Sequence, residues 1–362
     1  MSEAARPPVV IVSLRYVSTM QGRAPLPPQP HVALRRQRLE ALVDLSEGTG
    51  LEIGPLDSPI GTRPPYDVRY VDVLDTEHLR QHYGGDPAVV QDRIVDVDFS
   101  LQGADGMCTL AEAVSAAAPY RWVIASHVVE HVPDLVGWLA DVAAVLEDGG
   151  RLMLVVPDRR YTFDAMRPAT TVGQVLQAHS SRDPVPSERA VYDHYRSVVQ
   201  VSAAALWAGA EAAEAPRPFT KEDAVAMRER ALRGDYVDCH VWVFSPAEFV
   251  AQLGDLSELD LCDFAVERVL PTPRDELEFI AVLQRLPRNA SAERRAALRR
   301  GAFSALEADG NLDAPVVPDA DDGPRRRVLE VSAREVQVIR AKRAAMARLR
   351  AARARMVRRP PG

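Results

Sequence analysis

The stretch Leu51-Glu52-Ile53-Gly54-Pro55-Leu56 decides the fold. Its apolar residues predict a short buried strand that ends in an acid followed by a glycine, and glycine allows a sharp turn and a close approach of a ligand. Eighteen residues beyond Gly54, a second strand predicted over residues 68–73 reaches Asp72. An acid there can accept hydrogen bonds from both hydroxyls of a ribose, because nucleotides bind outside the carboxyl ends of such strands. The alternative is an ordinary strand–helix turn with Asp72 as a helix N-cap.

Strands and helices alternate on both sides of this stretch. Strands are predicted over residues 51–53, 68–73, 93–97, 122–125 and 152–156, and helices over residues 31–45, 110–117 and 134–146, the last stopped by Gly149-Gly150. This alternation indicates a parallel sheet that helices cover on both faces. Residues 159–245 read as mostly helical. A helix over residues 245–253 and strands over residues 259–269 and 276–284 then predict a hairpin that closes the sheet.

We therefore expect five segments. They are a lead-in and helix (1–46), a nucleotide-binding core (47–158), a helical insertion that acts as a lid or acceptor pocket (159–245), the completion of the core by the hairpin (246–286), and an acidic linker with a basic helical tail (287–362).

Composition narrows the class of protein. The chain has 362 residues, 47% of them hydrophobic, which is typical of a globular protein with a large core. No run approaches 18 uncharged apolar residues, so we expect no transmembrane helix, and residues 1–8 lack the pattern of a secretory signal. The three cysteines lie far apart without a CxxC pair, which argues against disulfides and a cysteine zinc site. We expect a cytoplasmic protein without a bound metal.

Four motifs together resemble a known family. Glu52-Ile53-Gly54, Asp72, residues 124–134 (IASHVVEHVPD) and residues 146–158 (LEDGGRLMLVVPD) are similar, in order, to motifs of class I S-adenosylmethionine (SAM)-dependent methyltransferases of the type 11 group. The resemblance covers roughly residues 51–158 and the hairpin up to about residue 286. It implies a Rossmann-like, seven-stranded, mostly parallel sheet of order 3-2-1-4-5-7-6, with a helical insertion after strand 5 and a basic C-terminal helix. It specifies the fold and the cofactor but not the acceptor.

One motif departs from the family. The family's first motif usually has three alternating glycines, whereas here only Gly54 is present and Leu56 and Ser58 occupy the next two positions. Many type 11 members carry a similar reduced motif with a Pro-Ile pair, as at Pro59-Ile60. The glycine spacing of a dinucleotide site and the Gly-Lys-Ser/Thr of a P-loop are both absent from the sequence.

The resemblance also implies roles for single residues. Glu52 would organise the first loop and approach the methionine amino group of the cofactor, while Gly54 and Pro55 would contribute backbone. Asp72 would bind the ribose, and Asp96 or Asp98, at the end of the third strand, would face the adenine amino group. Ser126 and His127 would line the methionine side. Glu130 and His131 would start the next helix, as functional or as capping residues.

Transfer to a hydroxyl needs a base within hydrogen-bond reach, and histidine suits that task near neutral pH. The candidates are His127, His131, His179, His194 and His240, of which the resemblance places His127 best as the base, with His194 and His240 next. For each of them, a structural or surface histidine is the alternative.

The run 157–168 (PDRRYTFDAMRP) follows the fifth strand directly and leaves the sheet on the cofactor side. Its arginines suit a polar or anionic acceptor, since guanidinium binds carboxylate or phosphate through two hydrogen bonds. A likeness to methyltransferases of surface-glycan gene neighbourhoods points to sugar-like acceptors. The candidate substrate residues are Arg159, Arg160, Tyr161, Asp164 and Arg167. The alternative is a structural Arg–Asp network that holds the insertion to the core.

The tail beyond residue 323 carries a charge of +11 and the rest of the chain −18. A basic tail fits a solvated helix, a peripheral contact with anionic lipid, or a nucleic-acid contact, although the acidic body disfavours nucleic acid. We predict a SAM-dependent methyltransferase (EC 2.1.1.-) that acts on an oxygen of a sugar-containing or small secondary-metabolite acceptor. The alternatives are a non-catalytic SAM-fold scaffold in a biosynthetic pathway and, less favoured, a nucleic-acid methyltransferase. The oligomeric state stays open.

Overall fold

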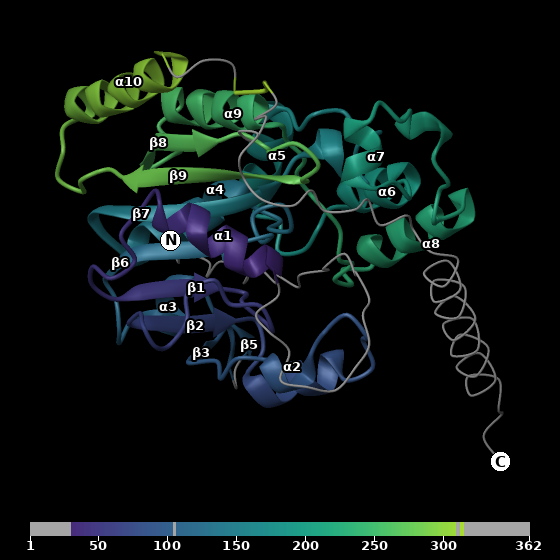
Figure 1. Ribbon diagram of the computed structural model, residues 1–362, viewed down its shortest axis with the longest axis horizontal. Helices are drawn as coiled ribbons and strands as arrows, with labels where there is room; N and C mark the ends of the chain where they lie inside the picture. Colours follow the sequence, from purple (N-terminus) through teal and green to yellow (C-terminus); the bar gives the residue numbers. More distant parts are fainter. Residues whose placement is uncertain (1–29, 104–105, 309–311, 315–362) are drawn as a thin grey trace, which may run out of the picture. The chain divides into compact units, whose positions relative to one another are not determined.

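One seven-stranded sheet runs through the computed structural model, which describes residues 30–103, 106–308 and 312–314 (Figure 1). The strand order is β3-β2-β1-β6-β7-β9-β8, and β9 alone runs antiparallel to its neighbours. Counted within this sheet, the order is 3-2-1-4-5-7-6, so the predicted fold class is confirmed. The strands are β1 (Gly50–Ile53), β2 (Val68–Asp72), β3 (Phe99–Ser100), β6 (Tyr120–Ser126), β7 (Leu146–Pro157), β8 (Phe264–Leu270) and β9 (Glu278–Arg285).

Two apolar layers cover the sheet because alternate residues of each strand point to opposite faces. In β6, for example, Val123 and Ala125 join one buried cluster while Trp122 and Ile124 join another. The first cluster packs under α4 (Leu135–Val145) and α9 (Pro246–Glu258), and the second under α1 (Pro30–Glu40). The first layer also includes α3 (Leu110–Val114), α5 (Val172–Ser181) and α10 (Ala292–Ala308). The remaining helix beside the core is α2 (Thr76–Tyr83), and β4 (Gln102–Gly103) pairs with β5 (Gly106–Met107) in a separate small sheet.

The insertion between β7 and α9 is mostly helical, as predicted. After α5 it contains α6 (Glu188–Ser197), α7 (Ala203–Trp207) and α8 (Lys221–Leu232). Three single turns of 3-10 helix also occur: η1 (Gln91–Arg93), η2 (Arg159–Tyr161) and η3 (Ala212–Glu214). The irregular lead-in and the basic helical tail predicted from the sequence lie outside the described residues.

Four local predictions were wrong. The third strand is not residues 93–97, because Ile94 packs with Leu56 and Leu79 in a small cluster and pairing with β2 begins only at Phe99. Gly149 and Gly150 do not stop a helix but lie in the first part of β7. The first helix ends at Glu40, and the strand predicted from residue 259 begins at Phe264, because α9 continues to Glu258.

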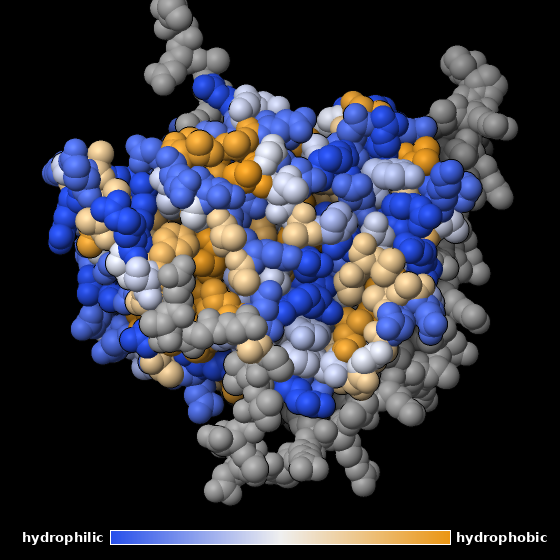
Figure 2. All heavy atoms as spheres, turned by 90° about the horizontal axis from the view of Figure 1, so that it is seen from above, coloured by the Kyte–Doolittle hydropathy of each residue, from blue (hydrophilic) through white to orange (hydrophobic). Residues whose placement is uncertain are grey.

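None of the described helices is long and apolar enough to cross a membrane. The face seen from above in Figure 2 shows small groups of hydrophobic residues separated by hydrophilic ones. In the described part of the chain, the exposed large hydrophobic side chains are Leu34, Val225, Leu232 and Leu259. Scattered apolar residues of this kind are normal on a protein surface.

Candidate active site

The loop after β1 is held by a buried carboxylate. Glu52 is 1% exposed, and its Oε1 and Oε2 accept hydrogen bonds from the backbone N–H groups of Ile60 (2.8 Å) and Gly61 (2.9 Å). Gly54 has a φ of +64°, and a Cβ there would lie 3.3 Å from Val128. Glycine is favoured here because its backbone takes this conformation without strain. Glu52 therefore fixes the path of the loop at the carboxyl end of β1.

Asp72 ends β2 at the same edge of the sheet. Its side chain is partly exposed, and Oδ1 accepts a hydrogen bond from the N–H of Val73 (2.7 Å). The N-cap of α2 is Asp75, whose side chain accepts from His78 N. The alternative reading of Asp72 as a helix cap is therefore wrong, and its carboxylate lies at the strand end where a ribose contact is predicted.

We predicted Asp96 and Asp98 at the end of the third strand, but both lie before its start. Both carboxylate oxygens of Asp98 accept from Arg63 (2.9 and 2.8 Å), and one also accepts from Tyr70 N (2.7 Å). Asp96 has an 89% exposed side chain 3.7 Å from Arg80. The reason is the late start of β3, which pairs Ser100 rather than Asp98 with Asp72.

Ser126 and His127 come at the carboxyl end of β6, next to β1. Ser126 is buried, and its Oγ has no hydrogen-bond partner among the described residues. His127 has a φ of +55°, and its Nε2 lies 2.7 Å from Oε2 of Glu278 and 3.0 Å from Nη2 of Arg35. Helix α1 and strand β9 thus bring one charge each to the end of β6.

Arg35 and Glu278 form a double hydrogen bond of 2.6 and 2.5 Å. Burial raises the pKa of Glu278, but the attraction of Arg35 and the hydrogen bond with His127 outweigh it and hold that pKa well below its usual range. The carboxylate therefore stays ionised beside His127. Nothing in the sequence pointed to this pair, because its members lie 243 positions apart.

A buried polar cluster lies just beyond His127. Glu130 and His131 are 1% exposed and His240 is 5% exposed, and one potential ligand atom of each lies within 4.8 Å of the other two. We predicted that Glu130 and His131 start the next helix, and this is wrong, because α4 begins at Leu135 with Asp134 as its N-cap. They instead occupy the turn between β6 and α4.

Each histidine of this cluster has a carboxylate on its other ring nitrogen. Nδ1 of His131 lies 2.9 Å from Asp238, and Nδ1 of His240 lies 2.5 Å from Asp164. Burial disfavours the charged form of His131, but the attraction of Asp238, its hydrogen bond, and the charges of Glu130 and Asp164 raise its pKa to about 9. The carboxylates therefore attract positive charge to this cluster.

His194 lies at the edge of the same cluster. Its Nδ1 accepts a hydrogen bond from the backbone N–H of His240 (3.3 Å), and burial lowers its pKa well below its usual value. A ring nitrogen committed to a backbone group is poorly suited to serve as a base. The structure brings His127, His131, His194 and His240 together, whereas His179 pairs with Asp134 (3.1 Å).

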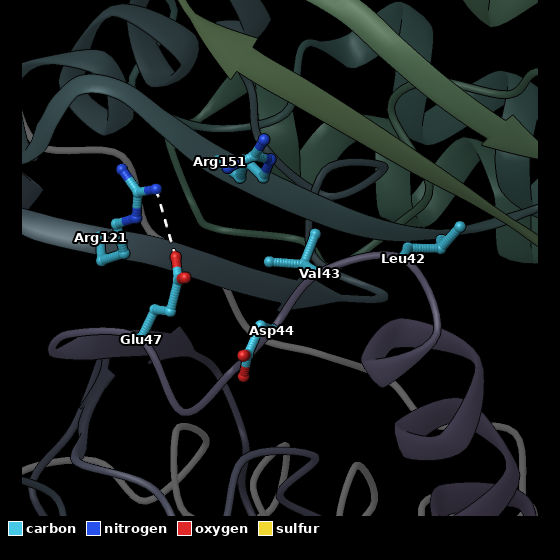
Figure 3. Close-up of a pocket in the computed structure, with 6 residues that line it drawn as sticks. All are labelled: Leu42, Val43, Asp44, Glu47, Arg121 and Arg151. Carbon is cyan, nitrogen blue, oxygen red and sulfur yellow. Dashed lines mark hydrogen bonds and ion pairs between the residues drawn. The ribbon is translucent and has the colours of Figure 1, made fainter.

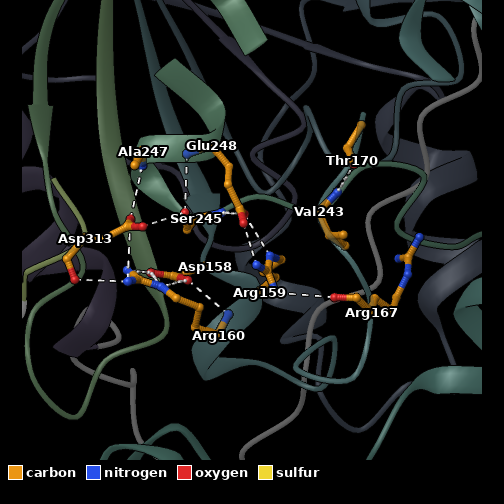
Figure 4. A network of polar contacts seen from close by, with 10 residues as sticks. All are labelled: Asp158, Arg159, Arg160, Arg167, Thr170, Val243, Ser245, Ala247, Glu248 and Asp313. Carbon is orange, nitrogen blue, oxygen red and sulfur yellow. Dashed lines mark hydrogen bonds and ion pairs between the residues drawn. The ribbon is translucent and has the colours of Figure 1, made fainter. Parts of the chain in front are cut away.

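The arginines predicted to bind substrate are paired within the chain (Figure 4). Arg159 binds both oxygens of Glu248 on α9, and Arg160 binds Asp158 and Asp313. Arg167 donates to Asp164 (3.1 Å) and to the carbonyl of His240 (2.7 Å). These contacts match the alternative of a structural network that holds the insertion to the core.

Aromatic side chains of the insertion lie in two different environments. Tyr161 stacks on Trp207 at 3.7 Å with the ring planes 8° apart, and both side chains are partly exposed. Trp242 and Phe244 are instead core residues with at most 1% exposure. The stacked pair is therefore a partly exposed aromatic surface of the insertion.

A small cavity of about 240 Å³ opens at the opposite edge of the sheet (Figure 3). Its lining includes Arg121, near the start of β6, and Arg151, which pairs with the next residue of β6, Trp122, and Arg121 also pairs with Glu47. Its volume is below the roughly 300–1,000 Å³ of typical ligand pockets. Because nucleotides bind at the carboxyl ends of such strands, this cavity does not fit the predicted site.

Comparisons with known proteins agree with the topology. Residues 31–210 match a family model described as a methyltransferase domain. No curated protein sequence matches the chain.

The solved structures that match the chain are only distantly similar to it. The mitomycin 7-O-methyltransferase is 13% identical with a TM-score of 0.32, and the match covers 69% of this chain but only 53% of that one, so the chain spans about half of it. A SAM-dependent methyltransferase from Methanosarcina mazei is 13% identical (TM-score 0.35; 69% and 97% covered). The magnesium protoporphyrin IX methyltransferase of Synechocystis, solved with bound SAH, is 13% identical (TM-score 0.32; 70% and 82% covered).

The match of the family model and the strand order of the sheet lead to one conclusion. The chain carries a class I, SAM-dependent methyltransferase domain, and SAM is the cofactor of its reaction.

Proposed function

We propose that the chain transfers the methyl group of SAM to a hydroxyl oxygen of a sugar-containing or small secondary-metabolite acceptor, with His127 as the base. The observation that carries the proposal is the His127–Glu278 contact of 2.7 Å at the end of β6. Asp72 and the loop held by Glu52 lie at the same edge of the sheet. A positioned histidine beside the predicted SAM site is what an oxygen acceptor requires.

The residues at this edge fit the group they are proposed to hold. Asp72 would bind the ribose hydroxyls, and Gly54 and Pro55 would let the cofactor approach the backbone. The buried Ser126 Oγ, without a hydrogen-bond partner among the described residues, offers a polar group to the methionine part. Bound SAM supplies a methyl group that its sulfonium has already activated.

The chain has to orient the acceptor, exclude water and take one proton. With Nε2–H donated to the ionised Glu278, Nδ1 of His127 carries the lone pair. The acceptor hydroxyl gives its proton to Nδ1 while its oxygen forms a bond to the methyl carbon. The bond from that carbon to sulfur breaks, and its electron pair stays on sulfur.

The insertion supplies the acceptor surface in this proposal. It follows β7 directly and therefore starts at the carboxyl edge, and the partly exposed Tyr161–Trp207 stack lies there on η2 and α7. An aromatic face suits the C–H face of a sugar ring. Direct contacts of Arg159, Arg160, Asp164 and Arg167 with substrate stay a prediction, as does a contact of the basic tail with anionic lipid.

The test is transfer of labelled methyl from SAM to a panel of glycosides and hydroxylated metabolites. His127→Ala should lower kcat at least 100-fold, the usual contribution of a positioned base. His78→Ala, which removes an exposed histidine paired with Asp75, should leave it unchanged. An unchanged rate and pH profile in His127→Ala would reject His127 as the base.

A further inference from the structure

The cluster of Glu130, His131 and His240 contains none of the acids proposed to hold SAM. Glu130 and His131 come from the turn after β6, and His240 comes from the far end of the insertion. Two imidazoles and one carboxylate are the donor set of many zinc enzymes and of non-haem iron sites. Their separation of 109 positions hid this set from the sequence analysis, which predicted no metal.

The cluster contains buried polar atoms that receive no hydrogen bond from the described residues. Both carboxylate oxygens of Glu130 and Nε2 of His131 have no hydrogen-bond partner within the described part of the chain. An uncompensated buried carboxylate is costly, so native structures pair it or let it bind a metal. Nδ1 of His127 at 3.5 Å and Nε2 of His131 at 3.9 Å from Glu130 Oε1 lie within ion-pair distance, but neither makes a hydrogen bond with this carboxylate.

The outer contacts orient the two imidazoles. Asp238 binds Nδ1 of His131 and Asp164 binds Nδ1 of His240, which leaves the Nε2 atom of each ring as its potential ligand atom. Histidines that ligate metals almost always have such a carboxylate or carbonyl on the other ring nitrogen. Three carboxylates (Glu130, Asp164 and Asp238) surround the imidazoles, and Arg167 is the guanidinium that pairs with one of them, so the cluster favours a positive charge on an imidazole or a bound cation.

We propose that Glu130, His131 and His240 form a binding site for a single divalent transition-metal ion, with Zn²⁺ as the ion that fits the donors best. The three ligand atoms lie within 4.8 Å of one another, and a bound ion would draw them to separations of about 3.3 Å. A fourth position stays open for water or an acceptor oxygen. The site adjoins His127, so the ion would lie beside the proposed base.

The test uses the full chain after chelation and dialysis. Calorimetric titration of this protein with Zn²⁺ alone should show one equivalent of Zn²⁺ bound per chain. Metal analysis after the Zn²⁺-loaded protein has been dialysed should give the same ratio. Co²⁺ should give the visible absorption of a tetrahedral site. Glu130→Gln and His240→Ala should each weaken Zn²⁺ binding at least about 100-fold, and Asp238→Asn about 10- to 100-fold.

The matched control is His179→Ala, which removes another histidine–carboxylate pair outside the cluster and should bind Zn²⁺ like the wild type. Circular dichroism shows which variants fold, and a Zn²⁺-dependent rise in the Tm of the wild type tests the site without any variant. The proposal is overturned if the folded wild type binds no Zn²⁺ at millimolar concentration. It is equally overturned if folded Glu130→Gln and His240→Ala bind Zn²⁺ with wild-type affinity.

Discussion

Two buried glutamates at the ends of neighbouring strands differ in their hydrogen bonding. Glu52, at the end of β1, and Glu130, just after β6, are both 1% exposed. Glu52 accepts two backbone hydrogen bonds, whereas Glu130 has no hydrogen-bond partner among the described residues. The same side chain with the same burial therefore holds a loop through hydrogen bonds in one region and lacks hydrogen bonds from the described residues in the other. The difference separates the scaffold of the site from the part that is arranged for a ligand.

Replacing Glu52 should have the largest effect on stability. Glu52→Ala leaves the buried N–H groups of Ile60 and Gly61 without an acceptor, which should lower the free energy of unfolding by about 4 kcal/mol. Glu52→Gln keeps one acceptor oxygen and should lose about half as much. Urea denaturation monitored by circular dichroism measures both. A loss below about 1 kcal/mol in Glu52→Ala would show that this carboxylate does not hold the loop.

The next largest effect on stability is expected at Glu278, a buried carboxylate that pairs with Arg35 and His127. Glu278→Gln leaves the guanidinium of Arg35 without its counter-charge and should cost about 3 kcal/mol at pH 7. Because the pKa of Glu278 is lowered in the folded state, its contribution is present above the unfolded-state pKa of about 4.3 and is lost as the pH falls below it. The gap in unfolding free energy between wild type and variant should therefore narrow from pH 7 to pH 3.5.

The control for this pH dependence is Glu276→Gln, which removes a more exposed partner of Arg38. It should change stability by less than about 1 kcal/mol, since exposed ion pairs contribute little. A gap between wild type and Glu278→Gln that stays constant down to pH 3.5 would contradict the assignment.

The smallest effect on stability is expected at Glu130, in contrast to Glu52. In chelated protein, Glu130→Gln removes no hydrogen bond from the described part of the chain and neutralises a buried charge. The free energy of unfolding should stay within about 1 kcal/mol of the wild type or rise. A loss as large as that of Glu52→Ala would mean that Glu130 is a structural carboxylate too.

The sheet could be predicted because each of its features is local. Short apolar runs, helical stretches between them and the final hairpin each extend over a few residues, and the right-handed connection of parallel strands then limits the possible orders. The third strand was misplaced because Ile94, Val95 and Val97 look like strand residues. Ile94 and Val97 instead pack with the cluster of Leu56 and Leu79 beside the first loop.

The polar site could be predicted only in part, because its contacts join distant segments. Glu52 and Asp72 follow directly from strands, so their positions at the sheet edge could be inferred. Arg35 reaches His127 across 92 positions, and Glu278 reaches it across 151. Contacts of that kind depend on how α1 and β9 pack, which no local pattern records.

The contrast between Glu52 and Glu130 bears on function only if the edge of the sheet around Glu52 and Asp72 binds SAM. The most direct test is calorimetric titration of SAM and its demethylated product into wild type, Asp72→Ala and Asp75→Ala. Asp75 caps α2 three positions away, so its variant controls for stability at the same turn. We expect micromolar binding that falls at least tenfold, or about 1.4 kcal/mol, in Asp72→Ala and is unchanged in Asp75→Ala. No binding of either compound by the folded wild type, or equal affinity in Asp72→Ala, would contradict the account.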